Sequence, residues 1–200
     1  MNTATRDKII RTAMDLFWVK GYQSTSVSDI LSRSQVHSGS LYHFFPGKQD
    51  VLIAVLETYR DEIEVGLLNY AWEGVDDPVD KIFALLNGYR THLLSTEYQY
   101  GCPIGSLALE LHEPDPRIRE LLAMNFNNWV DAVELCLEEA TDRFPESLDR
   151  RALAEFVLTI MEGAIMQART AHDIGLFDRN VEVLRGHIKL LMTQRELEDS

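Results

Sequence analysis

The stretch that decides the fold runs from Thr25 to Lys48 and reads TSVSDILSRSQVHSGSLYHFFPGK. Its first part predicts a short helix, because the Ser26 hydroxyl can cap a helix N-terminus and Asp29 favours the same positive end. The apolar pattern then breaks, and a second short helix is predicted over residues 38–45. The Pro-Gly pair that follows ends it. The stretch therefore predicts two short helices joined by a tight turn.

Two short helices in this order are typical of a helix-turn-helix, whose second helix lies in the DNA major groove and reads base edges with its N-terminal residues. A preceding helix over about residues 5–20 completes the motif. It presents apolar residues at helical spacing to a small shared core. These are Ile9, Ala13, Leu16 and Phe17.

The pattern across these three helices is specific. It reads Ile9-x3-Ala13-x3-Phe17-x3-Gly21-Tyr22, then Thr25-Ser26-Val27-x2-Ile30, then Gly39-Ser40-Leu41-Tyr42-x-Phe44-Phe45-x2-Lys48. In this pattern the first fifty residues resemble the DNA-binding head of the TetR family of transcriptional regulators. One departure lies at the inter-helix turn, where Ser34-Gln35 replaces the family's usual Ala-Gly. Glycine adopts a positive φ freely, so either Gln35 is modestly strained there or the turn differs slightly from that of the family.

The resemblance implies an all-α protein with two domains. A three-helix helix-turn-helix DNA-binding head is expected over residues 1–47, and a helical ligand-binding and dimerisation bundle over residues 48–200. The later chain itself indicates helices, since Asp77-Pro78 and Asp115-Pro116 are typical of helix starts. The final helix is expected to begin after a cap at Asp178.

The last two helices are expected to make a homodimer. In the resembled family the corresponding pair meets its copy in a four-helix interface, and small residues such as Gly163 and Ala164 allow close helix approach. A dimer would place two heads on an inverted-repeat DNA operator. The alternative is that both helices only close the core of a monomer.

The charge and hydropathy of the sequence limit the classes of protein to which it can belong. The net charge of −13 is unevenly divided: residues 1–50 hold six Lys and Arg against four Asp and Glu, and the remainder holds 13 against 28. This division argues against indiscriminate nucleic-acid binding but is compatible with a basic face on the head. No apolar run approaches the ~18 residues of a membrane span, and no signal peptide is evident. We therefore expect a cytoplasmic protein that does not enter a membrane.

DNA contacts are expected from the helix-turn-helix. The second helix would offer its small polar start to base edges, and its next turn would reach phosphates, as in the resembled family. Lys48 matches the phosphate-binding lysine of that family, and the first helix can donate hydroxyls to phosphate. For Tyr42 the alternative is packing within the head, and for His43 a solvated surface ring. The candidate DNA-binding residues are Thr25, Ser26, His37, Ser38, Gly39, Ser40, Tyr42, His43 and Lys48.

A small-molecule effector, apolar or aromatic, is expected in the helical body. Helical stripes there contain aromatic, sulfur and isolated polar residues, although such stripes are more often packed core. Glu162 could line the pocket as a carboxylate that favours a cationic ligand. The alternatives are that it lies at a helix edge or pairs with Arg169. No metal-ligand spacing and no cofactor motif is present, so neither is expected. The candidate ligand-binding residues are Tyr89, His92, Cys102, Trp129, Glu162 and Met166.

The prediction is a ligand-responsive repressor that is not an enzyme, with two alternatives left open. Cys102, directly before Pro103, could be an electrophile or redox sensor, since a thiol at a helix N-terminus is stabilised as thiolate. The resemblance to electrophile- and multidrug-responsive members supports that alternative, whereas an apolar setting opposes it. A protein-interaction module without DNA binding is a second alternative. An enzyme pairing Cys102 with His112 lacks a supporting strand-turn-helix context and an orienting group, so no catalytic residue is assigned.

Overall fold

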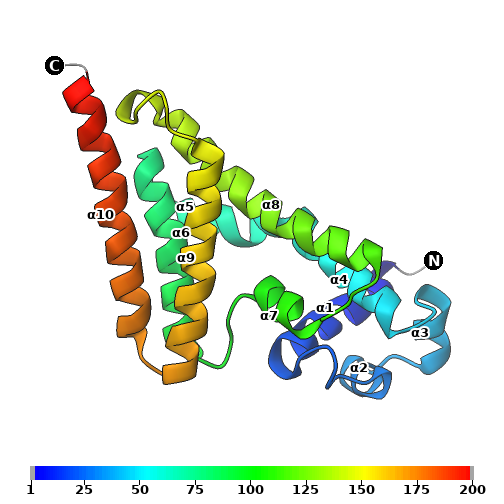
Figure 1. The fold of residues 1–200 in the computed structure, drawn as a ribbon. Coiled ribbons are helices and arrows are strands. Elements are labelled where there is room, and N and C mark those ends of the chain that lie inside the picture. Colours follow the sequence, from blue (N-terminus) through cyan, green and yellow to red (C-terminus); the bar gives the residue numbers. More distant parts are fainter. Residues whose placement is uncertain (1–2, 199–200) are drawn as a thin grey trace. The chain divides into compact units, whose positions relative to one another are not determined.

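The computed structural model describes residues 3–198, and these are built of α-helices without a strand, which confirms the predicted all-α class (Figure 1). The helices follow in the order α1 (Thr3–Lys20), α2 (Val27–Ser34), α3 (Ser38–Phe44), α4 (Lys48–Ile63), α5 (Asn69–Trp72), α6 (Pro78–Ser95), α7 (Pro103–Glu110), α8 (Pro116–Glu139), α9 (Arg150–Ala171) and α10 (Ile174–Glu198). A π-helical turn, η1 (Glu64–Leu68), lies between α4 and α5, and a 3₁₀ turn, η2 (Thr141–Arg143), follows α8.

Packing divides the chain into two compact units. The first, here called the head unit, holds the described residues through Glu62 together with Pro103–Phe126. The second, the body unit, holds Ile63–Cys102 and the described residues from Asn127 onward. The head unit thus adds α4, α7 and the start of α8 to the three predicted head helices. The functional boundary near residue 47 remains a prediction.

In the head unit, the residues that the sequence assigned to the core are buried. The apolar face of α1 packs with α2, which buries Ile30 and Ser34 fully, and with α3, which buries Leu41. The inner face of α4 is equally buried. Asn125 of α8 donates from its amide to the backbone oxygen of Leu56 at 3.0 Å, which ties α8 to α4. The buried α1 residues are Ile9, Ile10, Ala13, Leu16 and Phe17.

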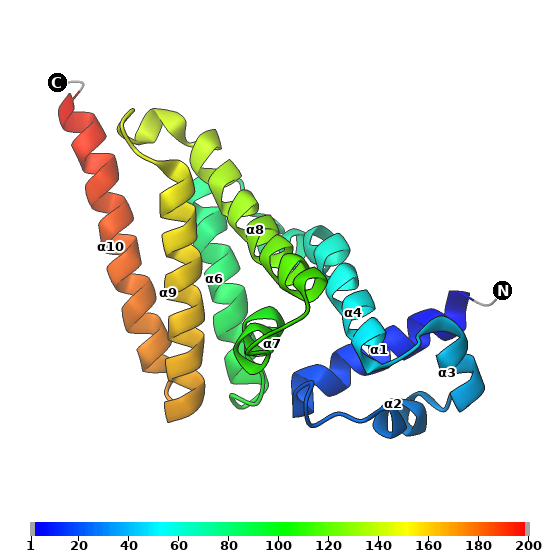
Figure 2. The same ribbon diagram turned by 45° about the vertical axis from the view of Figure 1, so that its right-hand side comes forward.

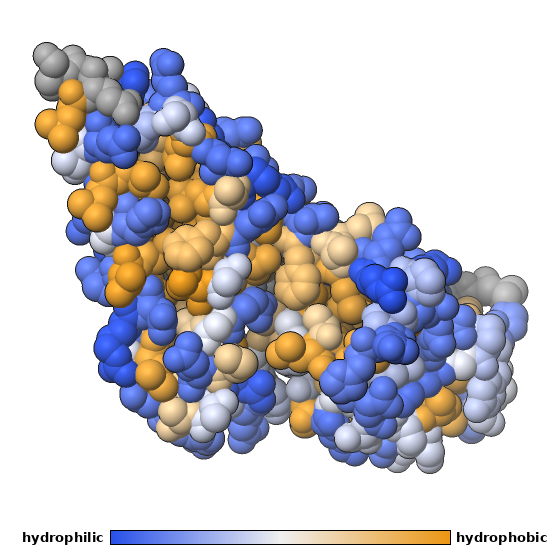
Figure 3. Space-filling view, in the orientation of Figure 1, coloured by the Kyte–Doolittle hydropathy of each residue, from blue (hydrophilic) through white to orange (hydrophobic). Residues whose placement is uncertain are grey.

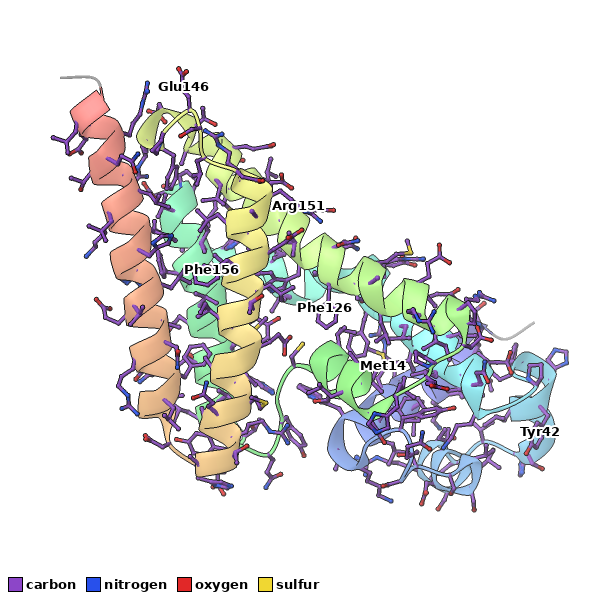
Figure 4. The ribbon with its side chains drawn as sticks, in the orientation of Figure 1. Met14, Tyr42, Phe126, Glu146, Arg151 and Phe156 are labelled. Atoms are coloured by element: carbon purple, nitrogen blue, oxygen red, sulfur yellow. The ribbon has the colours of Figure 1, made fainter. Side chains whose placement is uncertain are left out.

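In the body unit, α9 and α10 run antiparallel along each other, with α6 beside them (Figures 1 and 2). Their facing sides bury apolar residues such as Val157 and Ile188. Arg151 near the start of α9 forms ion pairs with Asp131 and Glu134 of α8, the latter at 3.0 Å, which fastens the two helices (Figure 4).

The face of α9 and α10 drawn in Figure 3 carries many apolar side chains. Several large apolar residues of these two helices are exposed in the single chain. Phe156 is 43% exposed and Leu190 is 70% exposed. The full set is Phe156, Met166, Val183, Leu190 and Leu197.

The predicted start of the last helix was wrong. A cap at Asp178 was expected, but α9 ends when His172 adopts left-handed backbone angles, and α10 begins two residues later at Ile174. The Asp178 carboxylate is used elsewhere: Arg90 of α6 donates to its two oxygens at 2.7 and 3.0 Å. A tertiary ion pair therefore takes the side chain that the local pattern assigned to a cap.

Candidate DNA-binding and effector sites

The helix-turn-helix forms as its sequence predicts. Ser26 and Asp29 make a reciprocal capping box: the Asp29 backbone N–H donates to the Ser26 hydroxyl at 3.1 Å, and the Ser26 backbone N–H donates to the Asp29 carboxylate at 2.8 Å. These bonds lower the pKa of the Asp29 carboxyl. Gln35 follows α2 with φ +53° and ψ +35°, in the left-handed region. Of the two alternatives for this turn, the structure has the one in which Gln35 takes a positive φ, a conformation that non-glycine residues rarely adopt.

Helix α3 presents its polar start to solvent and keeps its apolar residues inside. Leu41 and Phe45 are buried, whereas Tyr42 is 55% exposed and lies on the outer side of the helix (Figure 4). A Cβ added at Gly39 would meet nothing within 4 Å, so packing does not require a glycine there. The exposed candidates are His37, Ser38, Gly39, Tyr42 and His43, with Ser40 half-buried.

The other three candidate DNA contacts hold the turn between α1 and α2. Thr25 is 1% exposed, and its hydroxyl donates to the backbone oxygen of Gly21 at 2.7 Å. The Lys48 Nζ donates to the backbone oxygens of Tyr22 and Thr25, each at 2.9 Å. It also lies 4.2 Å from the centre of the Tyr22 ring. Ser26 caps the N-terminus of α2, as described above. Any DNA contact by Thr25, Ser26 or Lys48 would come in addition to these structural bonds.

Sequence reasoning missed one residue at this turn. Glu110, the last residue of α7, accepts the backbone N–H of Tyr22 at 2.8 Å and that of Gln23 at 2.6 Å. The available signal was an acidic side chain at the C-terminal end of a short helix, where the helix dipole disfavours it. The partner of that side chain lies 87–88 residues away in the sequence, so spacing alone could not identify it.

In the body unit, four of the candidate ligand residues form one buried cluster. Trp129 is 4% exposed and Cys102 is 7% exposed. Burial raises the pKa of the Glu162 carboxyl, and a hydrogen bond with Cys102 partly offsets that rise. Burial also raises the pKa of the Tyr89 hydroxyl well above its ordinary value, and the proximity of Cys102 and Glu162 adds to the rise. These four side chains, from α6, α8, α9 and the segment before α7, therefore influence one another directly.

Two polar atoms in this cluster have no hydrogen-bond partner in the part of the chain that the structure describes. They are the indole Nε1 of Trp129 and the Oε1 of Glu162, both buried. The indole lies close enough to the Tyr89 hydroxyl to act against the rise in the pKa of that hydroxyl, but the pair does not meet the distance and angle of a hydrogen bond. Buried polar atoms are usually paired, so an unpaired donor beside an unpaired acceptor is a feature to explain.

The remaining two ligand candidates lie differently. His92 is half-buried, with its ring 6.4 Å from that of Tyr100, and burial lowers the pKa of its imidazole. Met166 is 55% exposed on α9, so it is not part of the buried cluster in the single chain.

The proposed pairing of Glu162 with Arg169 does not occur. Arg169 instead donates to the backbone oxygens of Tyr98 and Gln99, at 3.3 and 3.0 Å. The turn that it holds contains two consecutive residues with positive φ, Glu97 at +49° and Tyr98 at +61°. The guanidinium therefore satisfies carbonyl groups of this strained turn.

Comparison with known proteins identifies the family. A family described as "Bacterial regulatory proteins, tetR family" matches residues 9–55, and one described as "Transcriptional regulator LmrA/YxaF-like, C-terminal domain" matches residues 78–182. An uncharacterized HTH-type transcriptional regulator of Mycobacterium tuberculosis is 31% identical over 179 residues, which cover 86% of this chain and 88% of that protein. The chain belongs to the TetR family. It is a DNA-binding transcriptional regulator.

Two further similarities agree with this assignment. The HTH-type transcriptional repressor DhaR of a Mycobacterium species is 25% identical over 169 residues, covering 84% of this chain and 83% of that protein. The crystal structure of a regulatory protein TetR from Rhodobacter sphaeroides superposes with a TM-score of 0.81 at 24% identity, covering 92% of this chain and 99% of that one. The second similarity concerns the fold.

Family membership also bounds what this TetR-family regulator does. Regulators of the family bind operator DNA and small-molecule effectors, act as dimers, and are not enzymes. Among the residues described, no three His, Cys, Asp or Glu side chains are grouped so that they could hold a metal ion. Within the same residues, none of the helices combines the length and the apolar character needed to cross a membrane.

Proposed function

We propose that this regulator is a homodimeric repressor, acting in the cytoplasm, that leaves an inverted-repeat operator when a small molecule binds its body unit. The observation that carries the proposal is the polar, exposed start of α3 above a fully buried Leu41. Such a helix can enter a major groove without losing its own core contacts. The similarity to a protein named as a repressor, DhaR, supports repression in preference to activation.

The head residues divide into two roles in this proposal. His37, Ser38, Gly39 and Ser40 face base edges, while Tyr42 and His43 contact phosphates from the following turn. Thr25, Ser26 and Lys48 principally hold the turn that positions α2, and Lys48 keeps one of its three N–H donors for a phosphate.

The exposed apolar side chains of α9 and α10 support the dimer. Phe156, Met166, Val183 and Leu190 are each at least 43% exposed in the single chain. Covering apolar surface of this kind is favourable by about 25 cal/mol per Å². Two copies related by a two-fold axis would bury these residues and present two heads to one operator. Met166 would then contribute to the subunit interface.

The effector in this proposal contacts the buried cluster of Tyr89, Cys102, Trp129 and Glu162. The Trp129 N–H calls for an acceptor on the ligand and the Glu162 oxygen calls for a donor, whereas the rings around them favour an apolar or aromatic frame. A ligand that binds better to the body conformation incompatible with DNA shifts the population away from the operator-bound form.

Electrophile sensing through Cys102 is the less supported alternative. The thiol is buried and its hydrogen-bond partner is a carboxyl group, Glu162. A thiol that is 7% exposed offers an electrophile from solvent little access to its sulfur.

The test is a DNA-binding assay with an inverted-repeat fragment from the promoter next to the gene. The wild-type protein is expected to bind it specifically and with strong salt dependence. Gly39→Ala, for which the fold leaves open space, should change the preference among operator base-pair variants by about tenfold. Tyr42→Phe should instead weaken binding to all operator variants by the same factor. Binding that is insensitive to sequence in the wild type would contradict the proposal.

A further inference from the structure

The turn between α1 and α2 depends on a side chain from far along the chain. Gly21 ends α1 with φ +84°, and the next two backbone N–H groups, of Tyr22 and Gln23, both donate to the Glu110 carboxylate. Two successive N–H groups after a left-handed residue form a small anion-binding cradle. The fit is close, since a Cβ on Gly21 would lie 3.0 Å from both Glu110 oxygens. Figure 2 shows α7 next to the end of α1.

Lys48 binds the same turn through its carbonyl groups. Its ammonium group donates hydrogen bonds to the backbone oxygens of Tyr22 and Thr25. The Tyr22 backbone N–H therefore donates to the Glu110 carboxylate of α7, and the Tyr22 backbone C=O accepts from the Lys48 ammonium of α4. Hydrogen bonds to ionised side chains are stronger than neutral ones, so this turn is firmly tied to both helices.

Both charged residues stand at the unfavourable end of their own helix. Glu110 is the last residue of α7, where the helix dipole disfavours an acid, and Lys48 is the first residue of α4, where it disfavours a base. Local helix energetics therefore explain neither position. The shared contact with the α1–α2 turn explains both, because each side chain finds complementary backbone groups there.

We propose that Glu110 is a positioning residue for DNA binding: through it, α7 fixes the turn that orients α2 and α3. Helix α7 follows Cys102 of the buried cluster directly in the chain. Any rearrangement that displaces α7 must either carry the turn with it or break the two bonds to Glu110. The inference rests on the proposed DNA-binding function of α3, but the contact itself is independent of the effector.

Glu110→Gln is the sharpest test, because the side-chain shape is kept. A carboxamide can accept only one of the two N–H groups and turns its own NH₂ toward the other. We expect the affinity for the promoter inverted repeat to fall about tenfold, with an unchanged salt slope because no phosphate contact is lost. The change in net charge alone would have the opposite effect on affinity, since removing a negative charge should strengthen DNA binding. The matched control is Glu113→Gln, an exposed residue with the same charge change, for which no loss is expected.

Amide hydrogen exchange separates positioning from simple stability. In the free protein, the Tyr22 and Gln23 amides should exchange about tenfold faster in Glu110→Gln than in wild type. In wild type, operator binding should also protect α7, because coupling between two sites is reciprocal. That operator-dependent protection should disappear in the variant, while protection of α2 and α3 persists.

Three results would overturn the proposal. Glu110→Gln could bind the operator as tightly as wild type, the exchange of Tyr22 and Gln23 could stay unchanged in the variant, or wild-type α7 could gain no protection on DNA. The last measurement needs no variant, so it stands even if Glu110→Gln fails to fold. If wild-type protein bound no DNA specifically, the proposed function would fail, whereas the exchange of the free protein would still test the Glu110 contact.

Discussion

The head unit and the body unit treat buried polar groups in opposite ways. At the α1–α2 turn, the buried Thr25 hydroxyl, the Lys48 ammonium and the Glu110 carboxylate each bond to backbone groups. In the body cluster, the Trp129 Nε1 and one oxygen of Glu162 are buried and have no hydrogen-bond partner among residues 3–198. A fully bonded turn favours one rigid arrangement, which suits a unit that must fit a fixed groove. Unpaired buried groups cost stability, and a bound ligand can recover it.

Thr25→Val tests the head side of this comparison and should have the largest effect. The substitution keeps the shape and removes a buried hydroxyl that donates to Gly21 at 2.7 Å. The free energy of unfolding should fall by about 2 kcal/mol, because the part-buried Gly21 carbonyl loses its hydrogen-bond donor and no water replaces it. Urea denaturation of wild type and variant measures the change. An unaltered midpoint would mean that the bond contributes nothing net.

Glu162→Gln tests the body side through pH. Burial raises the folded-state pKa of Glu162 above its ordinary value of 4.5, so the proton binds more tightly to the folded protein. The stabilising contribution is complete below the unfolded pKa and is lost as the pH rises through the folded pKa. Glutamine does not titrate. As the pH rises from 4 to 8, the free energy of unfolding of the variant should therefore increase relative to that of wild type by about 1–2 kcal/mol.

Thermal unfolding of both proteins across that pH range checks this prediction. Asp29 provides an internal contrast, since its lowered pKa gives stability that is lost as the pH falls. That loss is common to both proteins and cancels in their difference. A difference between wild type and Glu162→Gln that is constant with pH would show that Glu162 is not destabilised by its burial.

Gln35→Gly should give the smallest effect, with the opposite sign. Gln35 is held at φ +53°, where glycine is unstrained. The variant should be more stable by about 0.5–1 kcal/mol, since relief of the strain exceeds the added freedom of the unfolded chain. Chemical denaturation gives the value. Destabilisation would indicate that the Gln35 side chain makes a contribution larger than the strain.

Much of the fold was predictable because it depends on neighbours in the sequence. The capping box of Ser26 and Asp29 acts over three residues. The caps at Asp77 and Asp115, whose carboxylates accept N–H groups of the helices that follow, act over two or three. The buried face of α1 repeats at helical spacing. The strain at Gln35 followed from the family pattern together with the conformational limits of non-glycine residues. Local rules fail at Asp178, where an ion pair with Arg90 replaces the expected cap.

The helical class, the three-helix DNA-binding motif and the polar start of α3 could all be predicted from the amino-acid sequence. These properties follow from periodicity, capping and composition within a few residues. Only the tertiary structure decided that Lys48 and Glu110 meet at one turn, that Glu162 lies beside Cys102 instead of pairing with Arg169, and that Met166 faces outward. The physical reason is that a charged side chain binds whichever complementary group the fold brings near, and contacts across about 90 residues leave no periodic signal in the chain.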